Sequence, residues 1–273
     1  MSGLWTQQVR GILRLELRKN LLGMRALPVY LLAGAPLAVV AIFMIVSIFA
    51  GVTEDLKGYF GASMFFSVLF QFILRFPIYV ACVWVFMNLF RGEVLDRSLH
   101  YYFLTPVRRE VLVAGKFISA WLTTTILFVG STTICFVTVF AFLGAAGGSG
   151  PALGGPALGQ LTAYLGVTIL ACLGYGAVFM LVGQFFRNPI IPALIIFVWE
   201  GANSVLPALL KKLSVIFYLQ SLYPVPPDHG TISIIAEPVS PWLGVPGLIL
   251  FSALTLALSG LRIRHMEISY ASD

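Results

Sequence analysis

Residues 117–143 read FISAWLTTTILFVGSTTICFVTVFAFL, a stretch with no Asp, Glu, Lys or Arg. A helix rises about 1.5 Å per residue, and about 20 apolar residues therefore cross the ~30 Å hydrocarbon core of a bilayer. Five further segments of the chain have the same character: 28–50, 63–90, 161–183, 189–209 and 242–261. The sequence predicts an all-α integral membrane protein in which residues 1–273 form one domain with six transmembrane helices.

Positive charges are distributed unequally between the two sides of these segments. Of the 17 lysines and arginines, Lys57, Lys211 and Lys212 fall on one side and Arg75 lies inside a segment. The other thirteen share the side of the N-terminal residues: Arg10, Arg14, Arg18, Lys19, Arg25, Arg91, Arg97, Arg108, Arg109, Lys116, Arg187, Arg262 and Arg264. Because cytoplasmic loops carry an excess of Lys and Arg, we expect both termini to be cytoplasmic, in the inner (cell) membrane of a bacterium.

Composition excludes several classes of function. With 59% hydrophobic and 10% charged residues, the chain has no room for a soluble catalytic domain beside six spans. The net charge of +6 is explained by the loops beside an anionic leaflet, and it does not predict nucleic-acid binding. Cys82, Cys135 and Cys172 fall inside apolar segments without CxxC spacing, which favours buried small hydrophobes over a disulfide or a metal site.

The N-terminal segment, residues 1–27, predicts a cytoplasmic amphipathic helix at the membrane interface. Arg10, Arg14 and Arg18 share one helical face by their spacing of four, which suits contact with lipid headgroups. Glu16 falls on the opposite, apolar face and weakens the pattern. The alternative is a positively charged anchor that only sets topology.

Residues 91–116 form the longest cytoplasmic connection and the densest run of mixed charge. Thr105 followed by Pro106 indicates the start of a helix that continues into the third span, and residues 91–102 predict a second short helix before it. A rigid charged segment at the membrane surface suits docking of a soluble partner. The alternative is a solvated loop that only connects two spans. The charged residues at issue are Glu93, Asp96, Arg97, Arg108, Arg109 and Lys116.

Residues 210–241 hold enough apolar side chains around 215–223 for a short helix but too few for another crossing. Pro224, Pro226 and Pro227 end it. We expect a re-entrant or interfacial helix on the extracytoplasmic side, between the fifth and sixth spans.

The segment 91–117 resembles the connection after the second span in type-2 permeases of ATP-binding-cassette transporters. The resemblance is carried by Glu93-x-x-Asp96-x-Ser98-Leu99, by Leu104-Thr105-Pro106-Val107-Arg108-Arg109 and by Gly115-Lys116. This chain has Asp-Arg-Ser-Leu where many relatives carry Gly-Thr-Leu, so the local helix geometry differs. Six spans, an N-terminal interfacial helix and a helical outer loop also fit that family.

The resemblance implies a subunit that dimerises with an identical or different permease and is driven by two separate ATPase subunits. ATP and magnesium would bind those subunits. This chain lacks their phosphate loop, because Glu110 and Phe117 stand where the motif around Gly115-Lys116 needs Gly and Ser or Thr. It is therefore expected to be no enzyme itself. The resemblance also implies which residues couple the permease to the ATPase: Glu93, Asp96, Arg97, Thr105, Pro106, Arg108, Arg109 and Lys116.

Two charges fall inside predicted spans, Arg75 in the second and Glu200 in the fifth. Because intramembrane charges avoid lipid, three interpretations stay open: a structural pair, direct or through water; charges that contact cargo in the pathway; or unrelated partners. Pro77 predicts a kink beside Arg75.

Abundant aromatic residues in the second span favour an amphiphilic or lipid-like cargo. That this cargo is exported is what the resemblance implies. An ion-coupled transporter using Arg75 and Glu200 is the alternative. An integral membrane enzyme is less favoured, because only one carboxylate and no histidine lies within the spans.

Overall fold

The described part of the chain is entirely helical among its regular elements. The computed structural model describes residues 11, 16–17, 21, 23, 26–51, 61–95, 109–144, 155–186, 188, 190–202, 207–225 and 240–264. Five stretches are long and apolar enough to cross a membrane: Leu27–Phe49, Ala62–Leu89, Leu112–Leu143, Gly155–Val182 and Trp242–Ile263. The chain is an all-α, multi-pass membrane protein.

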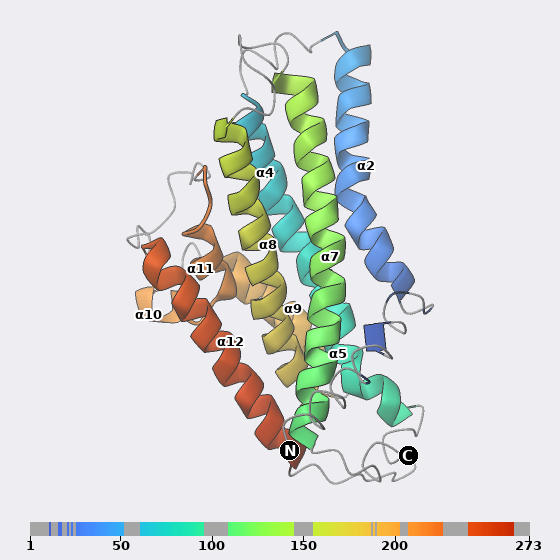
Figure 1. Cartoon of the computed structure of the whole chain (residues 1–273), viewed down its shortest axis with the longest axis vertical. Helices are drawn as coiled ribbons and strands as arrows, with labels where there is room; N and C mark the ends of the chain where they lie inside the picture. Colours follow the sequence, from blue (N-terminus) through green and yellow to red (C-terminus); the bar gives the residue numbers. More distant parts are fainter. Residues whose placement is uncertain are drawn as a thin grey trace.

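Three long helices form the front of the bundle. Helix α7 (Arg109–Gly144) lies between α2 (Leu27–Phe49) and α8 (Gly155–Val182), and α12 (Pro241–Arg264) slants towards the lower end of α7 (Figure 1). Helix α8 packs against α5, α7 and α12, and therefore holds the centre of the bundle.

The predicted second span consists of three consecutive helical elements. Helix α4 (Ala62–Ile73) is followed by the π-helical turn η2 (Leu74–Ile78) and by α5 (Tyr79–Leu95). Pro77 lies inside η2. Because proline cannot donate the helical hydrogen bond, the wider turn accommodates it. The irregularity predicted beside Arg75 is therefore present as a π-helical turn.

The predicted fifth span, 189–209, is not one continuous helix in the structure. Helix α9 ends after twelve residues, Ile190–Gly201, which corresponds to about 18 Å and is too short to cross the membrane alone. A new segment begins at Pro207, whose backbone is extended at φ −59° and ψ 151°. Five spanning helices are thus present among the described residues, and a sixth is not confirmed.

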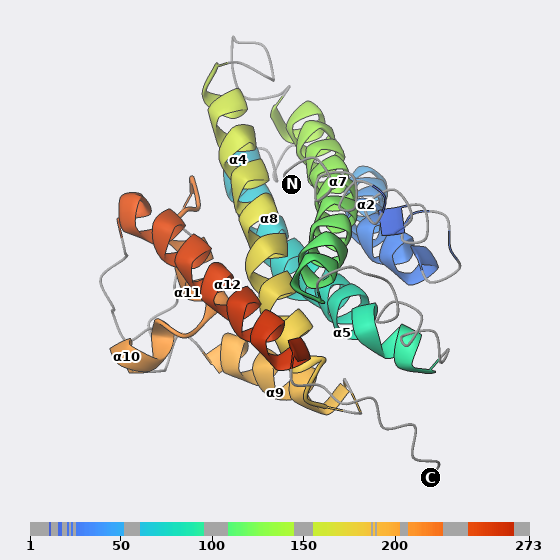
Figure 2. The ribbon, with the colours of Figure 1, turned by 60° about the horizontal axis from the view of Figure 1, so that its bottom comes forward.

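Two short helices follow α9: α10 (Ala208–Lys211) and α11 (Val215–Gln220). The helix predicted within 215–223 therefore exists, although it is shorter than expected. Figure 1 shows α10 and α11 below the upper ends of α2 and α7, and both views place α11 beside α12 (Figure 2). Whether these helices are re-entrant or interfacial stays a prediction.

Small residues let α8 approach its neighbours closely. A Cβ atom at Gly183 would lie 2.8 Å from the Cα of Met87 in α5, and a Cβ at Gly176 would lie 2.6 Å from the Phe86 ring. Glycine at helix interfaces allows such contacts in membrane bundles. The side chains of Cys82, Cys135 and Cys172 are free and fully buried in this core, as predicted.

Side chains also bond to the backbone of other helices. The Ser131 hydroxyl of α7 donates to the Ala33 carbonyl of α2 at 2.6 Å. The Tyr79 hydroxyl of α5 donates to the Ala193 carbonyl of α9 at 2.7 Å. These bonds hold α2 and α9 to the central helices.

Candidate functional site

The candidate coupling segment joins two helix ends that lie at the same end of the bundle. Helix α5 ends at Leu95 and α7 begins at Arg109, both at the bottom of Figure 1. The helix predicted to run from this segment into the third span is therefore present from Arg109 onward. Residues 91–95 continue α5 instead of starting a separate short helix, and Glu93 accordingly belongs to the last turn of α5.

Most of the predicted coupling and interfacial residues lie outside the described residues, and their roles stay predictions. They are Arg10, Arg14, Arg18, Asp96, Arg97, Thr105, Pro106 and Arg108.

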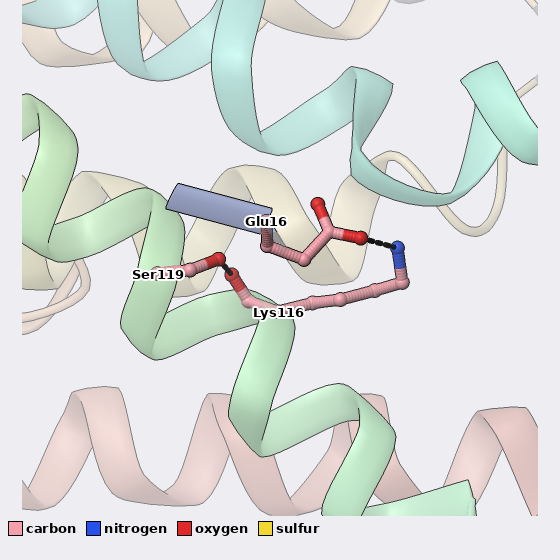
Figure 3. Close-up of polar contacts among 3 residues, drawn as sticks. All are labelled: Glu16, Lys116 and Ser119. Carbon is pink, nitrogen blue, oxygen red and sulfur yellow. Dashed lines mark hydrogen bonds and ion pairs between the residues drawn. The ribbon is translucent and has the colours of Figure 1, made fainter. Parts of the chain in front are cut away.

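Lys116 is the coupling-segment residue whose surroundings are defined. Its Nζ donates to Oε1 of Glu16 at 2.9 Å, and the two side chains are 1% and 6% exposed. Figure 3 shows the Lys116 side chain reaching out from α7 to meet the Glu16 carboxylate. Ser119 lies one turn further on, and its hydroxyl donates to the Lys116 carbonyl at 2.8 Å. An internal ion pair thus connects the N-terminal segment to the start of α7.

This geometry changes the expected position of Lys116. The sequence placed it near the membrane surface among residues that contact a partner, but it is fully buried. Removing one member of a buried ion pair leaves an uncompensated charge, at a cost of about 3–5 kcal/mol. Lys116 can therefore brace the coupling segment from within, and it cannot touch a soluble partner directly.

Sequence reasoning missed Glu16 as a functional candidate. Its position on the apolar face was treated as a defect in the amphipathic pattern. Glu16 is the one acidic residue among the first 25, and a carboxylate on an apolar face needs a cation. That requirement was the available signal, but nothing in the sequence identifies Lys116, a hundred positions away, as the partner.

Glu200, in the last turns of α9, binds the start of α11. Its Oε1 accepts from the Val215 N–H at 3.0 Å, and its Oε2 accepts from the Ile216 N–H at 2.9 Å. The Tyr175 hydroxyl of α8 donates to Oε2 at 3.3 Å. The carboxylate therefore satisfies free amide groups of a helix terminus and joins α8, α9 and α11.

No hydrogen bond or ion pair links Arg75 to Glu200 in the described part of the chain. Arg75 lies in η2 and is partly exposed. It does act on Tyr223, which follows α11: burial raises the pKa of the Tyr223 phenol, and the positive charge of Arg75 opposes that rise. The two intramembrane charges thus have different neighbours, and pairing through water stays a prediction.

The cluster around Tyr223 also ties the segment after α11 to α4. Tyr223 packs edge-on against Phe70 with ring centroids 5.6 Å apart. The Ser67 hydroxyl donates to the Val225 carbonyl at 3.0 Å. The segment after α11 is therefore held against α4, on the side of the bundle that carries Arg75.

Comparison of the chain with protein-family models, with curated proteins and with solved structures finds no match. The class that the fold defines is therefore a multi-pass helical membrane protein, without a family shown by similarity.

Proposed function

We propose that the chain is the transmembrane subunit of an ATP-binding-cassette transporter. It pairs with a second permease subunit, identical or different, and two separate ATPase subunits supply ATP hydrolysis. The complex exports an amphiphilic or lipid-like molecule. The proposal starts from the resemblance of residues 91–117 to the coupling segment of type-2 permeases.

The observation that carries the proposal furthest is the ion pair between Lys116 and Glu16. Residues 96–108 connect the end of α5 to the start of α7, and a soluble ATPase that pulls on them would load both helices. The 2.9 Å contact ties the first turns of α7 to the N-terminal segment. A displacement of the start of α7 would thus move the N-terminal segment with it, because a buried ion pair resists separation.

The second permease subunit is supported by the surroundings of Arg75. A partly exposed arginine within a span is costly when it faces lipid, and no described acidic residue forms an ion pair with it. The apolar side chains at every fourth position of the same span are exposed: Val68, Phe72, Phe76, Val80 and Trp84. This series of exposed side chains, the α4–α5 stripe, is covered in our proposal by the second subunit, which also shields Arg75 from lipid.

Copurification with the ATPase encoded nearest to the gene tests the function. The wild-type chain should retain this ATPase and stimulate its ATP hydrolysis in proteoliposomes. Reversing both Glu93 and Arg97 should lower retention and stimulation at least fivefold, since charges at an exposed rim set partner choice. Lys57→Glu, a charge reversal on the predicted opposite side, is the matched control and should change neither.

Two results would refute the proposal. One is unchanged ATPase retention after both charges are reversed. The other is cargo movement driven by an ion gradient without any ATPase, which would favour the ion-coupled alternative.

A further inference from the structure

A pocket beside Glu200 is not used by the proposed coupling mechanism. It has a cavity volume of about 280 Å³ and is enclosed by α8, α9, α12 and the segment that leads into α11. Its wall includes the rings of Tyr175, Trp199 and Phe251, and Glu200 is the charged residue that lines it. Ligand pockets in proteins usually measure about 300–1,000 Å³, so this one suits a small group or one end of a longer molecule.

Glu200 has hydrogen bonds but no counter-ion in the described residues. It is 6% exposed, and its three donors are two backbone N–H groups and a phenol. Buried charges in proteins are normally paired, and no lysine or arginine of the described chain forms an ion pair with Glu200.

The lining of the pocket decides which cation fits. A metal ion or a small hydrated cation needs several oxygen ligands, whereas the described wall offers one carboxylate among apolar and aromatic side chains. Aromatic faces attract weakly hydrated ammonium groups, and quaternary ammonium ligands bind in this way. The chemistry therefore favours an organic cation.

The rim of the pocket indicates how such a molecule would enter. Ile195 and Leu213 both line the pocket and are 64% and 60% exposed. An opening bordered by exposed apolar side chains suits a ligand that arrives from an apolar environment, with its hydrocarbon part remaining outside.

We propose that this pocket binds the ammonium group of an amphiphilic organic cation, with Glu200 as its counter-ion and Trp199, Tyr175 and Phe251 around it. Its assignment as a cargo site rests on the proposed transport function, whereas binding itself does not.

The test measures binding of tritiated benzyltrimethylammonium to the full chain in nanodiscs of zwitterionic lipid, without any ATPase. Neopentylbenzene, which replaces the quaternary nitrogen by carbon, is the uncharged competitor of matched shape. Binding should be saturable, unlabelled cation should displace it, and neopentylbenzene should compete at least tenfold more weakly. A wild-type chain without saturable binding, or equal competition by the two molecules, would overturn the proposal.

Variants locate the site. Leu213→Trp and Ile195→Trp obstruct the rim without altering Glu200, and each should lower affinity at least tenfold. Leu210→Trp adds the same ring to the same segment without lining the pocket and should bind like the wild type. Size-exclusion chromatography selects folded variants. Equal affinity of the folded Leu213→Trp and Leu210→Trp variants would overturn the assignment.

Glu200→Gln removes the charge and should also lower affinity at least tenfold, although it disturbs the α11 contact as well. The rim variants, which leave that contact intact, therefore carry the conclusion. The binding assay contains no ATPase, so it tests the pocket independently of the proposed function. A chain that does not bind the cation can still retain the ATPase, and a chain that does not retain the ATPase can still bind the cation.

Discussion

Lys116 and Glu16 stand a hundred positions apart in the sequence, yet their charged atoms meet at 2.9 Å inside the protein. Lys116, near the start of the third span, is therefore a buried charge that holds two segments together, and it does not lie at the surface. It also gives the N-terminal segment a defined attachment to the membrane bundle. The first prediction concerns this pair.

Replacing Lys116 or Glu16 alone by Met should lower the free energy of unfolding by about 3–5 kcal/mol, because one buried charge then lacks its partner. The double replacement should recover most of that loss, since two apolar side chains can fill the same space. Thermal unfolding in detergent measures all three variants. Additive effects of the two single changes would show that the pair is not energetically coupled.

A second prediction concerns Gly183. An alanine there would place its Cβ 2.8 Å from the Met87 Cα, and such overpacking costs about 1–3 kcal/mol. Gly166→Ala, inside α8 with nothing within 4 Å of the added Cβ, is the control and should be neutral or stabilising. The melting temperatures of the two variants provide the comparison, and equal values would contradict the close approach of α8 to α5.

The contacts of Glu200 give a third prediction. In Glu200→Gln the amide nitrogen faces one of the two backbone N–H donors, which then loses its acceptor at a cost of about 1–3 kcal/mol. Tyr175→Phe removes only the 3.3 Å bond and should cost about 0.5–1.5 kcal/mol. Urea unfolding in mild detergent should rank the variants in this order. A larger effect of Tyr175→Phe would mean that Glu200 does not hold the start of α11.

The proposed second subunit predicts cross-linking through the α4–α5 stripe. Phe76→Cys, in a background where the three native cysteines are replaced by Ala, should form a disulfide-linked or bifunctionally cross-linked dimer in native membranes. Leu254→Cys lies on the exposed face of α12 and should remain monomeric. Cross-linking at Leu254 but not at Phe76 would move the interface to α12 and leave Arg75 without its proposed cover.

Local composition was sufficient to predict most of the fold. Uncharged apolar runs predicted the five long helices, and Pro77 predicted the irregularity in the second span. The predicted fifth span, 189–209, is not confirmed as one crossing, because these residues are apolar throughout and hydropathy does not register the extended backbone at Pro207. The contacts that join this region, the Val215 and Ile216 N–H groups that donate to Glu200, are not visible in a hydropathy profile.

The candidate site was predictable only in part. Arg75 and Glu200 were recognised because charges inside spans are rare. The neighbours of these two residues depend on three-dimensional packing: Tyr175 lies beside Glu200, and Tyr223 lies near Arg75. The same holds for Lys116 and its partner Glu16. Each of these contacts joins segments distant in the sequence, so spacing along the chain gives no signal for them.

The near-contact of Gly183 with the Met87 backbone has a mechanical consequence. There α5 and the turn that follows α8 meet without an intervening side chain, so that point can serve as a pivot for the part of α5 that extends beyond it. The residue after Gly183, Gln184, donates from its side-chain amide to the Ser259 hydroxyl of α12. A tilt of the free end of α5 would therefore be passed across this junction to the last helix of the chain.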